Sequence, residues 1–161
     1  MKKLPFYLKI ISFCLLLFIW DYIFMNYRDL PNYIPIYFDF SGQATVSAPK
    51  ILIWFLAALS TFIYLLIFYL TKNIKSPLLK MPENIKEDSH KAEVIVSIFH
   101  LIIMLLLTVI SYESISVGLG KTESLSPLPN YLIGLLFLAV IIMVIYSYFL
   151  SKKPHSKKTL Y

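Results

Sequence analysis

The chain of 161 residues has little cysteine and little glycine, and both shortages limit what it can do. It has one cysteine, Cys14, which excludes an internal disulfide bond. Its four glycines leave little scope for the glycine-rich loops that bind nucleotide phosphates. The zinc motif His-Glu-x-x-His and the nucleophile motif Gly-x-Ser-x-Gly are also missing from the sequence. We therefore expect no catalytic residue, no metal site and no cofactor, and we predict that the protein is not an enzyme.

Charged residues are scarce as well. They make up 15% of the chain, against about 25% in an average soluble domain, whereas 58% of the residues are hydrophobic. The 12 Tyr, 12 Phe and 2 Trp exclude a disordered chain, which would be polar and poor in aromatics. The formal net charge of +6 would suggest nucleic acid as the partner of a soluble protein. Here the basic residues flank long apolar runs, so we expect a lipid bilayer as the partner and no nucleic acid.

Four apolar runs reach the length of about 20 residues that a helix needs to cross a bilayer. They cover residues 6–25, 51–70, 94–112 and 131–150. Isolated strands would leave backbone groups unpaired in lipid, and a closed barrel would show alternating polarity, so only helices fit these runs. The first run lacks a small-residue cleavage site, and we expect it to stay as an uncleaved anchor. The predicted fold is an all-α integral membrane protein, a single membrane domain over residues 1–161 with four transmembrane helices.

The basic residues predict the orientation of these helices. Twelve of the 15 Lys and Arg residues lie at the N-terminus, in the second connection (71–93) or in the tail (151–161). The other three are Arg28, Lys50 and Lys121. The positive-inside rule then puts both termini, the second connection and the tail in the cytoplasm, and the first connection, 26–50, outside. We expect a multi-pass protein of the cell membrane with both termini in the cytoplasm.

The first outer connection has the most distinctive sequence. Pro31 and Pro35 exclude a regular helix there. From residue 34 onward the pattern has a period of two, which predicts a short extended strand. Its apolar face would carry Ile34, Ile36, Phe38 and Phe40, and its other face Pro35, Tyr37 and Asp39. A turn at Ser41-Gly42-Gln43 would follow. Two interpretations stay open: the segment packs as a cap over the mouth of the bundle, or it is a recognition surface for an extracellular ligand.

These residues resemble the domain of unknown function 1648 family, found in membrane proteins similar to the SdpI toxin-immunity protein. The resemblance covers about residues 25–70 and rests on Leu30-Pro31, Ile34-Pro35-Ile36-Tyr37-Phe38-Asp39, Gly42 and Lys50. The family usually has His at the place of Tyr37 and Asn at the place of Asp39. The resemblance implies a secreted peptide or toxin as partner. The residues that it marks as candidate ligand contacts are Pro31, Pro35, Tyr37, Asp39 and Gly42.

Polar residues inside the predicted spans are few. His100 shares a helical face with Ser97, Met104, Thr108 and Ser111, and this face is expected to point into the bundle. We interpret His100 as a hydrogen-bonded core residue, because its helix carries no second ligand at metal-binding spacing. The alternative is a proton or metal site.

Asp21 is the other polar residue of this kind. It lies about 13 Å from the level of His100 along the bundle axis, too far for a direct pair. We expect Asp21 to anchor the outer loop.

Two function classes are compatible with these features. The first is a non-enzymatic membrane protein of the immunity or peptide-sensing kind, with the first outer loop as the contact surface. The alternative is a small transporter or channel subunit whose polar path is lined by Ser97, His100 and Thr108 of the third helix. The sequence does not determine the oligomeric state.

Overall fold

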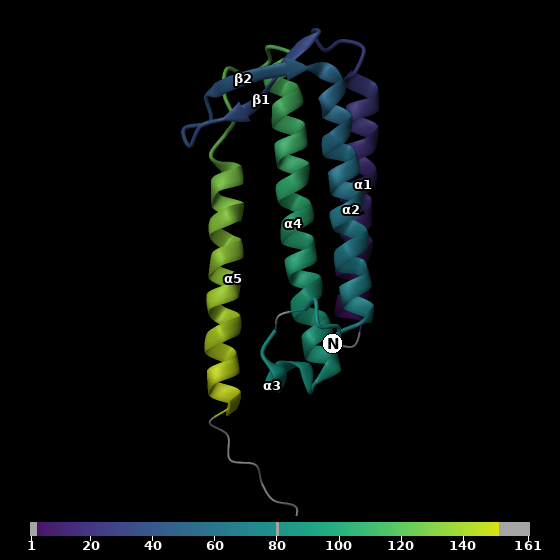
Figure 1. The fold of residues 1–161 in the computed structure, drawn as a ribbon, viewed down its shortest axis with the longest axis vertical. Helices are drawn as coiled ribbons and strands as arrows, with labels where there is room; N and C mark the ends of the chain where they lie inside the picture. Colours follow the sequence, from purple (N-terminus) through teal and green to yellow (C-terminus); the bar gives the residue numbers. More distant parts are fainter. Residues whose placement is uncertain (1–2, 80, 152–161) are drawn as a thin grey trace, which may run out of the picture.

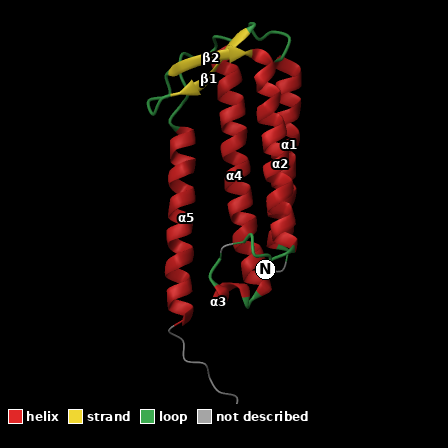
Figure 2. Ribbon diagram, viewed as in Figure 1, coloured by secondary structure: helices red, strands yellow, loops and turns green. Residues whose placement is uncertain are grey.

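The computed structural model describes residues 3–79 and 81–151, so the predicted tail lies outside the described residues except for Ser151. Four long helices, a two-stranded hairpin and two short helices make up this part of the chain (Figures 1 and 2). In chain order the elements are α1 (Leu4–Asn26), β1 (Tyr33–Phe38), β2 (Ala44–Pro49), the 3₁₀ helix η1 (Lys50–Leu52), α2 (Ile53–Lys72), α3 (Glu83–Lys86), α4 (Ser89–Gly118) and α5 (Leu128–Ser151).

Four helices are long and apolar enough to cross a membrane: α1, η1 with α2, α4, and α5. Each of the four predicted runs lies within one of them, and the helical prediction is confirmed. Successive long helices run in opposite directions (Figure 1). The hairpin lies across one end of the bundle, the hairpin end, and α3 lies at the other, the α3 end (Figure 2). This arrangement fits a multi-pass membrane protein.

The helix α4 has 30 residues and extends beyond the predicted run 94–112 at both ends. At its start the Asp88 side chain accepts a hydrogen bond from the backbone N–H of Lys91, which caps the first turn. At its end Gly120 has a φ of +68°, a left-handed conformation that glycine adopts without steric cost. The Asp88 cap and the glycine at position 120 mark the ends of α4, and the apolar run alone does not reveal them.

The core lies among α1, α2 and α4. Ile19 and Ile23 of α1, Ala57 of α2, and Met104 and Ile115 of α4 are buried in one cluster. The small Ala57 side chain lets α2 approach its neighbours closely, as small residues do between membrane helices.

The helix α5 lies at one edge of the bundle beside α4 and is the least buried of the four long helices (Figure 1). Among the residues of α5, all of which the structure describes, only Pro129 is buried. Hydrogen bonds hold the helix near its two ends. At the α3 end, Asn84 Nδ2 donates to the Ser147 carbonyl oxygen (2.6 Å), and at the hairpin end Asn130 Nδ2 donates to the Phe40 carbonyl oxygen (3.2 Å).

The predicted strand is present but belongs to a hairpin that the sequence did not predict. β1 pairs antiparallel with β2, and its register shifts on both sides of Tyr37, so Ile36 has no partner in β2. This irregularity breaks the alternation. Ile34 is fully buried as predicted, but Ile36 is 37% exposed and Phe40 is 92% exposed. The expected apolar face is therefore wrong for Ile36 and Phe40.

Candidate functional site

Lys50 fastens the hairpin to the end of α1. Its ammonium Nζ donates to the carbonyl oxygens of Leu30 (2.8 Å) and Tyr27 (3.3 Å), and it lies 5.1 Å from the centre of the Tyr27 ring. The backbone N–H of Lys50 also donates to the Asn32 carbonyl oxygen (2.9 Å). A cation is favoured here because the last carbonyls of a helix have no partner within it. The sequence prediction did not count Lys50 as a site residue, although it is one of the residues on which the family resemblance rests.

Asp39 fastens the turn between the two strands. One carboxylate oxygen, Oδ1, accepts hydrogen bonds from the Ser41 N–H (2.9 Å), the Ser41 hydroxyl (2.7 Å) and the Gln43 N–H (2.9 Å). The hydrogen bond from the Ser41 hydroxyl is the main cause that lowers the pKa of Asp39 below its ordinary value of 3.8, and the Gln43 N–H adds to it. The turn predicted at residues 41–43 is confirmed, and Asp39 uses one carboxylate oxygen to hold it.

Gly42 connects the turn to the segment between α4 and α5. It has a φ of +83°, and a Cβ atom there would lie 2.5 Å from the Leu125 carbonyl oxygen. The Leu125 N–H donates to the Gly42 carbonyl oxygen (2.9 Å), and Gln43 forms a bridge with Ser124. Gly42 is buried beneath this crossing backbone. It is thus a packing residue and cannot contact a ligand directly in this conformation.

Glu113 supports the same crossing segment from the end of α4. It is buried, and its two carboxylate oxygens accept hydrogen bonds from the N–H (3.0 Å) and the hydroxyl of Ser126. Sequence reasoning missed this pair, because residues 13 apart on either side of a helix end give no local signal of contact. Lys50, Asp39 and Glu113 thus hold the hairpin end in place through hydrogen bonds of their charged side chains.

Three aromatic side chains project from this fastened backbone. We call Tyr33, Tyr37 and Phe40 the aromatic cap surface; they are 66%, 64% and 92% exposed. Tyr37 is paired across the hairpin with Val46, which is also exposed. Of the five candidate ligand contacts, Pro31, Tyr37 and Asp39 are exposed, Pro35 is half-buried and Gly42 is buried. Because Gly42 is buried and Pro35 half-buried, the five do not form one exposed surface.

The polar face of α4 points into the bundle as predicted, although Thr108 is only half-buried. Its hydroxyls do not form a continuous chain. Ser97 and His100 are fully buried, and the His100 ring lies 4.9 Å from the Tyr64 ring of α2, centre to centre. The Thr108 and Ser111 hydroxyls donate to carbonyl oxygens of their own helix. Between the two groups lies the buried apolar side chain of Met104.

His100 lacks the hydrogen bonds that a core histidine was expected to make. Neither of its ring nitrogens, nor the Ser97 hydroxyl, has a partner among the described residues. Nearer the α3 end on the same face, Glu93 forms an ion pair with Lys9 of α1 at 2.5 Å. Glu93, Ser97 and His100 are spaced at i, i+4 and i+7, so they share one side of α4. The sequence prediction missed the Lys9–Glu93 pair.

Asp21 does not anchor the hairpin, contrary to the prediction. Its side chain is exposed on the outer side of α1, beside Cys14, Trp20 and Phe24, and it forms no hydrogen bond or ion pair with the described residues. The physical reason is the direction in which the Asp21 side chain leaves the helix. Ile19 and Ile23, on either side of Asp21, face the core, which turns the intervening carboxylate outward. Lys50 and Glu113 do the anchoring instead.

These features define a class: a bundle of four helices able to span a membrane, capped at one end by a fastened hairpin. Within the described residues, no group of three or more His, Cys, Asp or Glu side chains could hold a metal ion. Comparison of the chain with protein-family models, with curated proteins and with solved structures found no match. The resemblance of residues 25–70 to the domain of unknown function 1648 family therefore stays a prediction.

Proposed function

We propose that the protein is a non-enzymatic membrane protein of the immunity or peptide-sensing kind, and that its aromatic cap surface contacts a secreted peptide or toxin. One observation carries the proposal. Tyr33, Tyr37 and Phe40 are exposed on a backbone that Lys50, Asp39 and Glu113 hold in place. The family resemblance of this same segment supports it.

The physical argument concerns the energy of binding. Large aromatic side chains contribute most of the binding energy in many interfaces. A surface that is already ordered loses less conformational entropy when a ligand binds, so more of the contact energy appears as affinity. A fastened hairpin with three exposed aromatics combines both properties.

The proposal includes an orientation. The hairpin end faces the outside of the cell, and both termini lie in the cytoplasm, because most of the basic residues lie toward the other end of the spans. Reporters fused within residues 71–79 should behave as cytoplasmic, and reporters fused near Ser47 or Thr122 as external. A cytoplasmic signal from the Ser47 fusion would contradict the orientation and, with it, the proposed contact with a secreted ligand.

The function is tested with a paired set of variants in the host cell. A strain without the protein is exposed to the secreted peptides of its own culture medium, and growth is compared with a complemented strain. The wild-type protein should restore growth, and the double variant Tyr37→Ala/Phe40→Ala should fail to do so. The matched control Phe62→Ala/Phe137→Ala removes two exposed aromatics from the helices and should restore growth.

Two results of this experiment would overturn the proposal. One is full protection by the Tyr37→Ala/Phe40→Ala variant at a normal protein level. The other is a wild-type protein that changes neither growth nor gene expression in response to the peptides.

Transport is a second candidate function, and one observation favours it. The buried nitrogens of His100 and the Ser97 hydroxyl have no hydrogen-bond partner among the described residues. They are therefore available to bind water or, at His100, a proton. The apolar side chain of Met104 separates them from Thr108, so a path through the bundle requires a second conformation. Proton flux into vesicles that contain the purified protein tests this candidate. Flux that His100→Gln abolishes would support transport, and flux equal to that of empty vesicles would eliminate it.

A further inference from the structure

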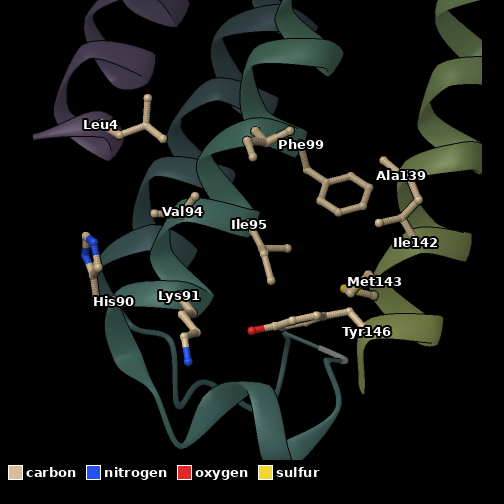
Figure 3. A pocket seen from close by; sticks show the side chains of 11 residues that line it. Leu4, His90, Lys91, Val94, Ile95, Phe99, Ala139, Ile142, Met143 and Tyr146 are labelled. Carbon is tan, nitrogen blue, oxygen red and sulfur yellow. The ribbon is translucent and has the colours of Figure 1, made fainter. Parts of the chain in front are cut away.

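A groove lies between α4 and α5 near the α3 end of the bundle (Figure 3). Its cavity of about 590 Å³ falls within the range of roughly 300–1,000 Å³ that is usual for small-molecule sites. Its walls are apolar, with Ile95 and Phe99 of α4 opposite Ala139, Ile142 and Met143 of α5 (Figure 3). The lining of the cavity therefore favours a hydrocarbon chain over a polar solute.

The polar residues of the groove gather at one end. His90 and Lys91 belong to the first turn of α4, and Tyr146 lies in the last turns of α5. The Tyr146 ring reaches across the groove with its hydroxyl turned toward α4 (Figure 3). Lys91 Nζ lies 3.0 Å from Asp88 Oδ2, and its side chain is 52% exposed, so its ammonium has donors left for another acceptor.

The groove is built into the fold by the way in which α5 is held. Asn84 bonds to the Ser147 carbonyl oxygen and accepts a hydrogen bond from the Ser147 hydroxyl (2.9 Å), which fixes α5 at the α3 end. The hairpin and the segment after α4 hold the opposite end of α5 (Figure 1). A flexible chain can enter from the side.

We propose that this groove binds one glycerophospholipid molecule. An acyl chain lies between Phe99 and Ile142, and the phosphate accepts hydrogen bonds from the Lys91 ammonium and the Tyr146 hydroxyl. Lys91, which keeps exposed donors beside Asp88 at the end of an otherwise apolar groove, matches an amphiphile with one anionic group at the end of a long chain. His90, on the same rim, supplies a further donor to the headgroup.

Native mass spectrometry of the full-length protein released from nanodiscs tests this site. The probes are phosphatidylglycerol and a diacylglycerol with the same acyl chains. We expect one phosphatidylglycerol molecule to stay bound and diacylglycerol to be lost. Lys91→Gln should weaken retention of phosphatidylglycerol about fivefold, as expected for one basic residue at a lipid phosphate. Ala139→Trp or Ile142→Trp fills the groove and should abolish retention.

Two matched variants keep the test specific. Lys72→Gln removes a lysine at the same end of the bundle but outside the groove, and Val140→Trp adds the same bulk to the outward side of α5. Both should retain phosphatidylglycerol like the wild type. Equal retention of diacylglycerol and phosphatidylglycerol, or equal loss in Lys72→Gln and Lys91→Gln, would overturn the proposal. So would a dimer that Ala139→Trp dissociates while lipid retention is unchanged.

Discussion

The hairpin end and the buried centre near His100 differ in whether their polar side chains have hydrogen-bond partners. At the hairpin end, Lys50, Asp39 and Glu113 each make two or more hydrogen bonds. In the centre, Ser97 and His100 are fully buried without a partner among the described residues. An unsatisfied buried polar group costs about 1–3 kcal/mol, so only the first arrangement stabilises the fold. The comparison indicates that polar residues hold the cap together, whereas apolar packing holds the centre.

This difference also separates the two candidate functions. In the cap, the side chains of Lys50, Asp39 and Glu113 already have hydrogen-bond partners within the protein. A partner molecule would therefore contact the exposed aromatic side chains. The centre has unsatisfied hydrogen-bonding groups and no exposed surface. Contact with a peptide belongs to the first region, and proton or water binding belongs to the second.

The largest effect is expected from Gly42→Ala at the hairpin end. The new Cβ would meet the Leu125 carbonyl oxygen, and the positive φ is strained for alanine, so the cap should lose about 3 kcal/mol of stability. Gly134→Ala is the matched control, because nothing lies within 4 Å of its Cβ position in α5. Limited proteolysis of the hairpin should be much faster in Gly42→Ala alone. Equal proteolysis of both variants would show that the crossing segment does not fasten the turn.

A smaller loss is expected from Lys50→Met. The change removes the charged donor to the Tyr27 and Leu30 carbonyl oxygens but keeps an apolar side chain of similar length, and it should cost about 2 kcal/mol. Lys121→Met removes an exposed lysine near the same end and serves as the control. Denaturant unfolding in detergent gives the two free energies. If Lys50→Met were as stable as Lys121→Met, the hydrogen bonds of Lys50 would not hold the cap.

In the centre, removing a polar side chain should stabilise the protein instead of destabilising it. Replacing His100 by Leu removes two unsatisfied nitrogens from an apolar site, so the variant should be about 1 kcal/mol more stable than the wild type. Ser111→Ala is the control, since that hydroxyl is satisfied by the Leu107 carbonyl oxygen of its own helix. A destabilised His100→Leu variant would mean that His100 makes stabilising hydrogen bonds in the membrane, and the contrast between the two regions would fail.

The smallest effect is the pH dependence of the turn. Asp39 has a pKa below its ordinary value of 3.8 in the folded protein. Its contribution to the stability of the turn is therefore fully present above pH 3.8 and is lost as the pH falls through the lower pKa of the folded state. The chemical shift of the Gln43 amide proton should titrate with a midpoint below 3.8. Asp39→Asn should remove this titration. A midpoint above 3.8 would show that the carboxylate does not accept the Ser41 and Gln43 hydrogen bonds.

The sequence predicts the helices well because a membrane span has a single dominant requirement, an apolar run of sufficient length. It also predicts β1 and the turn, because proline and alternation act locally. It misses β2, whose residues are mostly exposed and show no alternation. The shift of register at Ile36 turns Ile36 and Phe40 away from the expected face, and nothing near them in the sequence indicates that shift.

The candidate site was less predictable than the fold, because its contacts join distant parts of the chain. Lys50 reaches back 20 residues to Leu30, and Gly42 meets Leu125 across about half of the sequence. Asp39 and Gly42 were expected to contact a ligand, yet one holds the turn and the other is covered. Tyr37 is the one aromatic residue among the five candidate contacts, and its side chain is exposed.

Amide hydrogen exchange of the full-length protein in nanodiscs tests most directly whether the cap is already ordered without a ligand. The N–H groups of Asp39, Lys50 and Leu125 donate to backbone oxygens within the cap, so they should exchange slowly. The N–H of Phe40 donates no hydrogen bond to the described residues, so it should exchange fast by comparison. Exchange of all four amides at the rate of an unstructured chain would contradict the account, because the aromatic cap surface would then have no fixed backbone to present it.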